Sequence, residues 1–563
     1  MKIAVLSGKG GAGKTFVSVN LAAAIGNASY VDCDVEEPNG RLFFKPEQVK
    51  TSQVSQLIPS FDPSLCTGCR ECVKACRFNA LIYIKKRPMV FQEVCHSCGL
   101  CSLCCPSNAI QEIPRPMGSL EQGRSGSIKV VTGILNPGEA SGIPVIKAAQ
   151  KAVREDENVI FDCPPGSACS VQESIGKADF CILVAEPTAF GFHNFQMVEE
   201  LVRLHRKPFG VVISKEEKPY APLESYCREK NIQILLRIPF SKIGGADFGW
   251  RSGSQKGSCA DEAVSVAMQK NRRECNMKRL LILSGKGGTG KTTTAAAFIR
   301  FSQAQAFADC DVDAPNLHIV NEIEGKPETT DFIGGEKAVI DPDICTGCGL
   351  CQESCRFDAI RDLGDHFSAD PISCEGCGVC SYVCPVKAVS LREDVAGKQI
   401  LYTGSKVFST AKLKMGRGNS GKLVTNVKMA MLKNAPDCPL AVIDGSPGIG
   451  CPVIASVSGM DLALIVAEPS ESGISDLKRL VKTAGTLQTK LAVCVNKYDI
   501  SPENTKEIEH FCQESGIPFL GKIPYDPMAS TAINRGLSLG DIDCPGRNAL
   551  YEIYEKTSRL LGI

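Results

Sequence analysis

Residues 7–15 read SGKGGAGKT, and residues 284–292 read SGKGGTGKT. Each stretch satisfies G-x4-G-K-T, follows a short apolar run and precedes a segment that can form a helix. A glycine-rich turn at a helix N-terminus points backbone N–H groups at a ligand, so this context predicts a phosphate-binding loop. The alternative is a glycine turn without a ligand, and the repetition in the same context argues against it.

The whole chain of 563 residues reads as two homologous halves. The loops lie 277 positions apart, and so do the DCD triplets at 32–34 and 309–311. Asp162 and Asp444 lie 282 positions apart. An offset that drifts slowly indicates a duplication with a few small insertions.

Short apolar runs recur in both halves and end in polar residues. Continuous apolar strands separated by helical stretches are typical of a parallel sheet buried on both faces, so we expect an α/β fold with ligands beyond the carboxyl ends of the strands. The amphipathic segment 548–561 predicts a final helix packed on the sheet rather than a helix lying on a membrane, because it has few basic residues. The runs are 3–6, 159–161, 181–185 and 211–213, with counterparts 280–283, 440–443, 462–467 and 491–495.

Sixteen of the thirty cysteines form two runs, each containing C-x2-C-x2-C-x3-C twice. Three thiolates in a tight loop, with a fourth four positions on, suit a cubane iron–sulfur cluster. Zinc is the alternative, because it often uses paired C-x2-C. Pro106 and Pro385 follow the last cysteines, as in bacterial ferredoxins, which favours clusters. We therefore expect an inserted α+β two-cluster ferredoxin domain in each half.

The resemblance to bacterial ferredoxins implies that the fourth cysteine of each quartet reaches the other cluster, which gives four [4Fe-4S] clusters. The implied ligand sets are Cys66, Cys69, Cys72 with Cys105; Cys95, Cys98, Cys101 with Cys76; Cys345, Cys348, Cys351 with Cys384; and Cys374, Cys377, Cys380 with Cys355.

The expected domains follow from the loops and the cysteine runs. Residues 1–59 with 115–276 form the first P-loop domain, and 60–114 its ferredoxin insert. Residues 277–338 with 394–563 form the second, and 339–393 its insert. The seam lies in the glycine-rich stretch near 241–277.

The composition argues against some classes of function. The formal charge is +1, from 63 basic and 62 acidic residues, so no basic excess indicates nucleic acid. No stretch approaches the ~20 apolar residues of a membrane span. Abundant cysteine without a secretory leader indicates a reducing cytoplasm.

The loops, the DCD triplets and the turns DCPPG (162–166) and DGSPG (444–448) together resemble the MinD/ParA and nitrogenase iron-protein class of P-loop ATPases. With its cysteine inserts between the two switch regions, the chain is similar to MinD-superfamily ATPases carrying a ferredoxin domain, here fused as two copies. The resemblance implies an ATP-hydrolysing, monomeric pseudo-dimer formed within one chain.

The resemblance also implies roles for individual residues, against the alternative that the four aspartates serve capping or turn chemistry. Lys9 and Lys286 match the signature lysine that reaches the partner's nucleotide, which here would lie in the other half. Asp34 and Asp311 match the switch I aspartate that orients the attacking water. Asp162 and Asp444 match the switch II aspartate that supports Mg²⁺. The loop residues that would bind ATP phosphates and Mg²⁺ are Gly11, Gly13, Lys14, Thr15, Gly288, Gly290, Lys291 and Thr292.

Base recognition is expected to be unequal. Asn496 and Asp526 match positions that resembling proteins use on adenine, whereas the first half has Ser214 and Ser241 there. Serine lacks the paired amide geometry that reads a base edge, so the site with Asn496 should bind its nucleotide more tightly.

Two further cysteines, Cys169 and Cys451, each follow a switch II aspartate by seven residues. The nitrogenase iron protein has a cluster-ligating cysteine at the same interval, on the axis between its subunits. The resemblance implies that these two cysteines approach one another and hold a further metal or cluster, or form a redox pair. The alternative is that they are buried structural cysteines.

The expected function is ATP-gated electron transfer through the four clusters to a redox partner protein. One alternative is a carrier that assembles or delivers an iron–sulfur or other metal cofactor to an apo-metalloprotein. Another is a ParA-like positioning ATPase whose clusters sense redox state.

Overall fold

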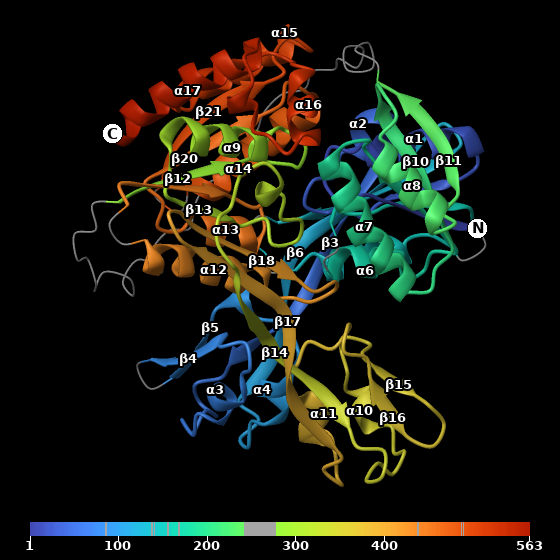
Figure 1. The fold of residues 1–563 in the computed structure, drawn as a ribbon. Helices are drawn as coiled ribbons and strands as arrows, with labels where there is room; N and C mark the ends of the chain where they lie inside the picture. Colours follow the sequence, from blue (N-terminus) through green and yellow to red (C-terminus); the bar gives the residue numbers. More distant parts are fainter. Residues whose placement is uncertain are drawn as a thin grey trace.

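Each half of the chain forms one nine-stranded sheet, and both sheets have the same strand order (Figure 1). This computed structural model describes residues 1–563 except 85–86, 137–138, 140, 155–156, 167–168, 241–276, 436–437, 486 and 488. The predicted seam near 241–277, apart from Met277, and the predicted base-site residue Ser241 lie outside the described residues.

The first sheet runs in the order β11 (Ile234–Pro239), β10 (Phe209–Glu216), β9 (Phe180–Ala185), β1 (Lys2–Leu6), β8 (Val159–Asp162), β2 (Ser29–Asp32), β7 (Ile128–Leu135), β6 (Ile110–Ser125), β3 (Glu47–Phe61). The second runs in the order β22 (Phe519–Ile523), β21 (Lys490–Asn496), β20 (Leu462–Ala467), β12 (Lys278–Leu283), β19 (Leu440–Asp444), β13 (Ala306–Asp309), β18 (Val407–Leu413), β17 (Val389–Thr403), β14 (Glu328–Ile340). The first seven strands of each list are parallel, and the last two join antiparallel.

The apolar runs of the sequence form these strands, which confirms the predicted α/β fold. Alternate residues of β12 enter cores on opposite faces of the sheet: Leu281 and Leu283 in one, Leu280 and Ile282 in the other. In β1, Leu6 and Val5 divide in the same way. A strand covered on both faces is apolar at every position, and this is why the runs are continuous rather than alternating.

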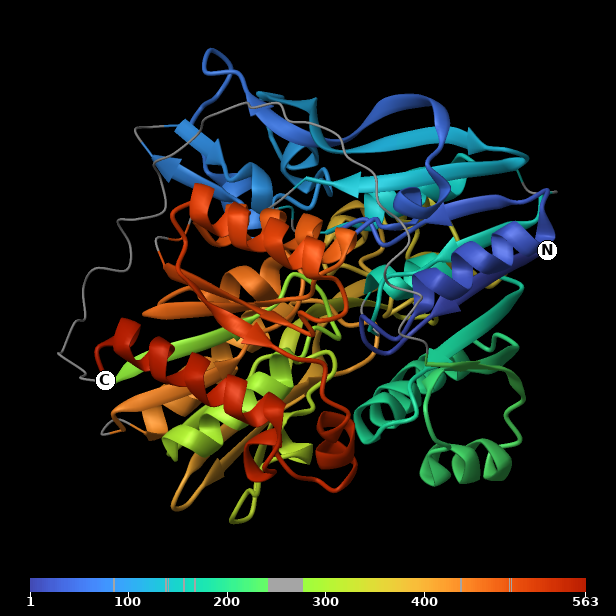
Figure 2. The ribbon, with the colours of Figure 1, turned by 90° about the horizontal axis from the view of Figure 1, so that it is seen from above.

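Helices cover both faces of each sheet (Figures 1 and 2). The final helix packs with Leu550 and Ile553 in the same core as Leu280, as predicted for segment 548–561. In the first half the helices are α1 (Lys14–Ile25), α2 (Gly40–Phe44), α5 (Ile143–Lys151), α6 (Cys169–Ile175), α7 (Ala189–Leu204) and α8 (Ala221–Glu229). In the second they are α9 (Lys291–Ser302), α12 (Ser420–Asn434), α13 (Cys451–Val457), α14 (Glu471–Gly485), α15 (Pro502–Glu514), α16 (Met528–Asn534) and α17 (Pro545–Leu561).

The cysteine-rich inserts stand at the end of two long antiparallel ribbons. Strands β3 and β6 stay paired from Glu47 opposite Arg124 to Phe61 opposite Ile110, and β14 and β17 form the equivalent ribbon. The predicted insert boundaries 60 and 114 therefore fall within β3 and β6 rather than in linkers. The inserts contain α3 (Glu71–Ala75), β4 (Leu81–Ile84), β5 (Arg87–Val90), α4 (Leu100–Leu103), then α10 (Leu350–Glu353), β15 (Ile360–Asp362), β16 (Phe367–Ala369) and α11 (Val379–Val383). Both lie together below the sheets in Figure 1.

The two halves meet at their phosphate loops. A Cβ built on Gly10 would lie 2.8 Å from the backbone N of Gly287, and one on Gly11 would lie 2.8 Å from Cα of Gly288. The reverse contacts are equally short, so the two loops pack on each other around a pseudo-two-fold axis. The glycines here are required by close backbone approach as well as by phosphate binding.

Over the described ranges, none of the helices combines the length and apolar character that a membrane crossing requires.

Candidate functional site

Each phosphate loop ends in a glycine with left-handed backbone geometry. Gly13 has φ of 90° and Gly290 has φ of 95°, which favours glycine, and α1 and α9 begin at the next residues, Lys14 and Lys291. The Lys14 ammonium donates to Asp162 Oδ1 at 2.8 Å, and the Lys291 ammonium donates to Asp444 Oδ1 at 2.5 Å. Burial lowers the pKa of Lys14, but the surrounding carboxylates outweigh it and raise the pKa above its usual range. Both lysines are therefore charged at the helix N-terminus that would receive phosphate.

The two aspartates of each DCD triplet have different roles. In the first half Asp32 accepts hydrogen bonds from the backbone N–H groups of Asp34 and Gly40, at 3.2 and 2.9 Å. Asp309 accepts three backbone N–H bonds in the second half. The first aspartate of each triplet thus holds the turn. The second aspartate, Asp34 or Asp311, has its carboxylate beside a lysine of a phosphate loop.

The two signature lysines, Lys9 and Lys286, differ in whether the ion-pair partner lies in the other half of the chain. Lys9 Nζ lies 3.5 Å from Asp311 Oδ2, across the boundary between the halves. Lys286 stays within its own half, where it donates to Ser472 Oγ at 2.7 Å and lies 3.9 Å from Glu468 Oε2. In the first half Asp34 instead pairs with Lys14 of its own loop at 3.3 Å. The two nucleotide sites are therefore unequal in charge pairing.

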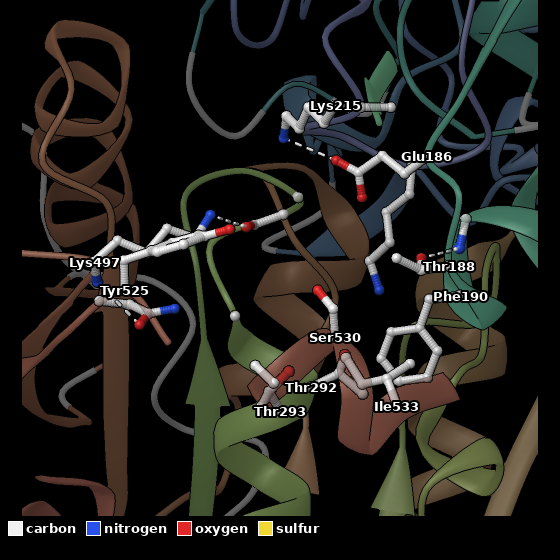
Figure 3. Close-up of a pocket in the computed structure, with 18 of the residues that line it drawn as sticks. Glu186, Thr188, Phe190, Lys215, Thr292, Thr293, Lys497, Tyr525, Ser530 and Ile533 are labelled. Atoms are coloured by element: carbon white, nitrogen blue, oxygen red, sulfur yellow. Dashed lines mark hydrogen bonds and ion pairs between the residues drawn. The ribbon is translucent and has the colours of Figure 1, made fainter. Parts of the chain in front are cut away.

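A cavity of about 570 Å³ lies over the second phosphate loop at the boundary between the halves. Its lining includes Asn496 and Asp526 from the second half. Figure 3 shows Thr292 of the second half in the same cavity as Phe190 and Lys215 of the first half. This places the predicted loop and base-recognition residues of the second half in one cavity, closed on one side by the other half.

Asn496 and Asp526 also shape the wall of this cavity. The Asn496 amide donates to the Thr289 carbonyl at 2.8 Å, and a Cβ on Gly290 would lie 2.3 Å from its Nδ2. The Asp526 carboxylate accepts from the N–H groups of Met528 and Gly546, both at 2.9 Å. Burial raises the Asp526 pKa, but these backbone bonds outweigh it and hold the pKa below its usual value. Ser214 takes the place of Asn496 beside Gly13 in the first half.

Two lysines that donate hydrogen bonds to carbonyls of the phosphate loops were not predicted from the sequence. Lys215 donates to the Gly11 carbonyl and, at 2.8 Å, to Glu186. Lys497 donates to the Gly288 carbonyl at 3.3 Å and to Glu468 at 3.1 Å. Both lysines have φ of 58°, an unusual conformation for a residue other than glycine. Their recurrence 282 positions apart, the same interval as Asp162 and Asp444, was the available signal.

The structure groups the ferredoxin-type cysteines into sets. One cavity is lined by Cys66, Cys69, Cys72 and Cys105, and another by Cys355, Cys374, Cys377 and Cys380. These are two of the four crossed sets implied by the ferredoxin resemblance. In a third set, Cys101 interacts with Cys98, Cys95 and Cys76. Of the fourth set, Cys351 interacts with Cys345 and Cys348, and Cys384 packs in a hydrophobic cluster that also contains cysteines of the neighbouring set.

Sets composed of thiols alone fit iron–sulfur clusters. Within the part of the chain that the structure describes, no three His, Cys, Asp or Glu side chains lie close enough to hold a single metal ion. The four cysteine sets are the residues that the resemblance to ferredoxins assigns to clusters.

The two inserts contact each other directly. The Cys98 and Cys377 thiols interact across the boundary. Arg356 binds both carboxylate oxygens of Glu112, at 2.8 and 2.7 Å, and also donates to the Ser97 carbonyl. The sets containing Cys98 and Cys377, the inner sets, therefore adjoin, whereas the sets containing Cys69 and Cys348, the outer sets, each have an exposed cysteine.

Cys169 and Cys451 are the first residues of α6 and α13, directly after the switch II turns. Cys169 Sγ donates to the Gly416 carbonyl of the other half at 3.2 Å, and burial raises its pKa to about 12. Burial, followed by the nearby Glu36 of the other half, raises the pKa of Cys451. Each thiol thus faces the opposite half, and their shared metal role stays a prediction.

Comparison with known proteins agrees with the fold and the loops. The profile of the CobQ/CobB/MinD/ParA nucleotide binding domain matches residues 3–243 and again 280–539. An uncharacterized protein of Methanocaldococcus jannaschii is 32% identical over 292 residues, which are 50% of this chain and 97% of that protein.

Two further comparisons are with proteins of named function. An iron-sulfur cluster carrier protein of Pyrococcus abyssi is 27% identical over 298 residues, 49% of this chain and 84% of that protein. Among solved structures, the cell division ATPase MinD of Pyrococcus furiosus aligns with 18% identity and a TM-score of 0.31, over 50% of this chain and 99% of that one. Since the two stretches that match the family profile together make up most of the sequence, the chain belongs to the CobQ/CobB/MinD/ParA nucleotide-binding family and contains two tandem copies of its domain.

Proposed function

We propose that the protein is an ATP-dependent carrier that assembles or delivers an iron–sulfur cluster to an apo-metalloprotein. The observation that carries this proposal is the exposure of Cys69 and Cys348 in the outer cysteine sets. A cluster bound there is accessible to the thiols of a target. The similarity to iron-sulfur cluster carrier proteins supports the same function.

The connection between nucleotide and cysteines supports control by ATP. Each insert continues from its sheet as a paired ribbon, β3 with β6 and β14 with β17. The ribbons leave the sheets between the DCD turns and the switch II aspartates, which are the parts that respond to phosphate in this class of fold. A change at the phosphate loops therefore reaches the inserts through hydrogen-bonded strands.

Transfer of iron to a target tests the proposal. Protein reconstituted anaerobically with labelled iron is mixed with an apo [4Fe-4S] enzyme, with Mg²⁺–ATP, with Mg²⁺–ADP or without nucleotide. We expect ATP to change the rate of iron transfer, and Asp444→Asn to abolish that dependence. If nucleotide changes neither transfer nor access of a chelator to iron, the carrier proposal is wrong.

The matched test of the outer sets compares Cys69→Ser with Cys98→Ser. Loss of transferable iron in the first variant, with less effect in the second, supports the outer sets as the delivery site. A double variant Cys169→Ser, Cys451→Ser tests whether these two thiols take part: lowered iron content or transfer supports a role, and no change in either excludes it.

A second candidate function is ATP-gated electron transfer, favoured by the contact between Cys98 and Cys377. Clusters on the inner sets would be neighbours across the two halves. An electron donor keeps its iron while its reduction potential depends on nucleotide. Potentiometric titration with and without ATP, on the protein used for the transfer assay, separates the two functions.

A further inference from the structure

The switch II aspartates of the two halves occupy equivalent positions but have different hydrogen-bond partners. Asp162 lies beside Asp32 in the register of β8 and β2, and Asp444 lies beside Asp309 in the register of β19 and β13. Both aspartates are fully buried. Because the backbone is equivalent, any difference between the two carboxylates comes from the side chains around them.

In the first half, protein donors occupy both oxygens of Asp162. The Tyr30 hydroxyl donates to Oδ2 at 2.8 Å, and Lys14 donates to Oδ1 at 2.8 Å. Ser18 Oγ lies 3.1 Å from the same Oδ1 and 2.9 Å from the Lys14 carbonyl oxygen. The hydroxyl has one proton and can donate it to only one of these two acceptors. Tyr30 and Ser18 are both fully buried.

Tyr30 is held firmly in this position. Its ring packs against Phe44 at 4.9 Å between centroids, and its hydroxyl lies only 2.1 Å from the place where a Cβ on Gly40 would stand. The hydroxyl therefore remains on Asp162 when Lys14 turns toward a bound phosphate.

In the second half the same positions carry no hydroxyl. Phe307 stands where the first half has Tyr30, and Ala295 stands where it has Ser18, both 277 positions later. Asp444 Oδ1 accepts from Lys291, and Oδ2 is buried without a hydrogen-bond partner among the described residues. A buried carboxylate oxygen without a donor is unfavourable unless a cation or its bound water completes it.

We propose that the two nucleotide sites differ in metal: the second half binds Mg²⁺–nucleotide through Asp444, and the first half binds nucleotide without a divalent cation, because Tyr30 and Ser18 occupy Asp162. A water bound to Mg²⁺ would donate a hydrogen bond to the switch II aspartate. In the first half that water would compete with the Tyr30 and Ser18 hydroxyls for Asp162. We expect Mg²⁺ affinity in the first site to be lower by about 100-fold. The proposal deepens the ATP dependence above but does not require cluster delivery.

The experiment counts metal and nucleotide bound to the full-length, cluster-loaded protein. Mn²⁺ replaces Mg²⁺, a non-hydrolysable ATP analogue replaces ATP, and equilibrium dialysis gives both stoichiometries. At a Mn²⁺ concentration that saturates the second site but stays well below the dissociation constant expected for the first, about 100-fold higher, we expect two nucleotides and one Mn²⁺ per chain. Two Mn²⁺ per chain, or none, would overturn the proposal without any variant.

Reciprocal variants then test the residues. Tyr30→Phe with Ser18→Ala gives the first half the side chains of the second, and the count should rise to two Mn²⁺. Phe307→Tyr with Ala295→Ser places donors beside Asp444, and the count should fall to none. Iron content and circular dichroism equal to those of the wild type establish that each variant is folded. A folded Tyr30→Phe, Ser18→Ala protein that still binds one Mn²⁺ contradicts the role of these two residues. Cluster transfer does not enter this readout, so the two proposals fail separately.

Discussion

The Lys9 ammonium lies 3.5 Å from the Asp311 carboxylate, so a lysine of the first phosphate loop faces the switch I aspartate of the second half. Lys286, its counterpart, contacts Ser472 and Glu468 of its own half. Among the described residues, Lys9 therefore forms an ion pair across the boundary between the halves and Lys286 does not.

We predict that Lys9→Ala lowers the rate of ATP hydrolysis more than Lys286→Ala. A fixed positive charge stabilises the negative charge that develops on the phosphate in the transition state. Its removal lowers kcat by roughly 100-fold. Steady-state phosphate release measures the effect, with Lys326→Ala as a control on an exposed lysine. Equal losses in the two loop variants would show that both lysines cross between the halves during turnover.

The contact between the phosphate loops predicts sensitivity to a single methyl group. Gly10→Ala places a Cβ 2.8 Å from the backbone of Gly287, which cannot move aside as a flexible side chain can. Overpacking of this kind costs about 1–3 kcal/mol. Urea unfolding and ATP hydrolysis should both be impaired. Gly485→Ala, with nothing within 4 Å of the new Cβ, is the matched control and should match the wild type.

The crossed cysteine sets predict which cluster each cysteine serves. Cys105 lines a cavity with Cys66, Cys69 and Cys72, although it follows the next quartet in sequence. In a Cys104→Ala background, where the neighbouring thiol cannot substitute, Cys105→Ser should lower iron content by about one quarter, since one of four clusters is lost. Mössbauer spectroscopy and iron analysis measure this. Unchanged iron, or loss of two clusters, would contradict the assignment.

A pair of histidines between the halves predicts that the free energy of unfolding is lower in mild acid than at neutral pH. His193 on α7 meets His318 of the other half at 5.8 Å between ring centroids. Burial, then the neighbouring His318, Lys412 and Lys9, lower the pKa of His193 to about 4. Between that value and the ordinary pKa of about 6.5 the unfolded chain binds more protons, so the free energy of unfolding falls as pH drops through this window.

The measurement is the urea midpoint at pH 7.5 and pH 5, under anaerobic conditions. His193→Gln should reduce the difference between the two midpoints. His510→Gln, on an exposed histidine, controls for acid effects on the rest of the protein and should leave the difference unchanged. A midpoint difference unaffected by either substitution would show that other groups titrate.

Unequal base recognition predicts unequal nucleotide affinities. Asn496→Ala removes an amide that lines the cavity and holds the Thr289 carbonyl, so nucleotide binding to the second half should weaken about tenfold. Ser214→Ala removes one hydroxyl and should weaken the first site by less than about threefold. Titration with a fluorescent ATP analogue resolves the two sites. Equal effects would mean that the base is read elsewhere.

Much of the fold followed from local patterns. Apolar runs such as 280–283 and 462–467 identify strands covered on both faces, and the glycine loops identify the helix starts at Lys14 and Lys291. The insert boundaries were harder to predict, because β3 and β6 continue across Pro59, Pro114 and Pro116, and prolines are usually boundary signals in a sequence. The crossed cysteine sets came from spacing together with the resemblance to ferredoxins.

The differences between the halves were harder to predict. That Tyr30 and Ser18 donate to Asp162 depends on side chains from separate elements meeting at one buried carboxylate. The sequence shows only that phenylalanine and alanine replace them in the second half. Likewise, Lys215 and Lys497 recur at a constant interval, but only the fold brings them to the loop carbonyls. Local sequence predicts elements well, and it predicts poorly which distant side chains share a hydrogen bond.

The paired ribbons that bear the inserts have a mechanical consequence. Strands β3 with β6 and β14 with β17 pair along their length, with local register shifts in each ribbon. The halves also touch at many places besides the phosphate loops, among them His193 with His318, Cys169 with Gly416 and Arg356 with Glu112. A rotation of one half against the other would therefore have to change contacts at both the nucleotide end and the cysteine end of the molecule.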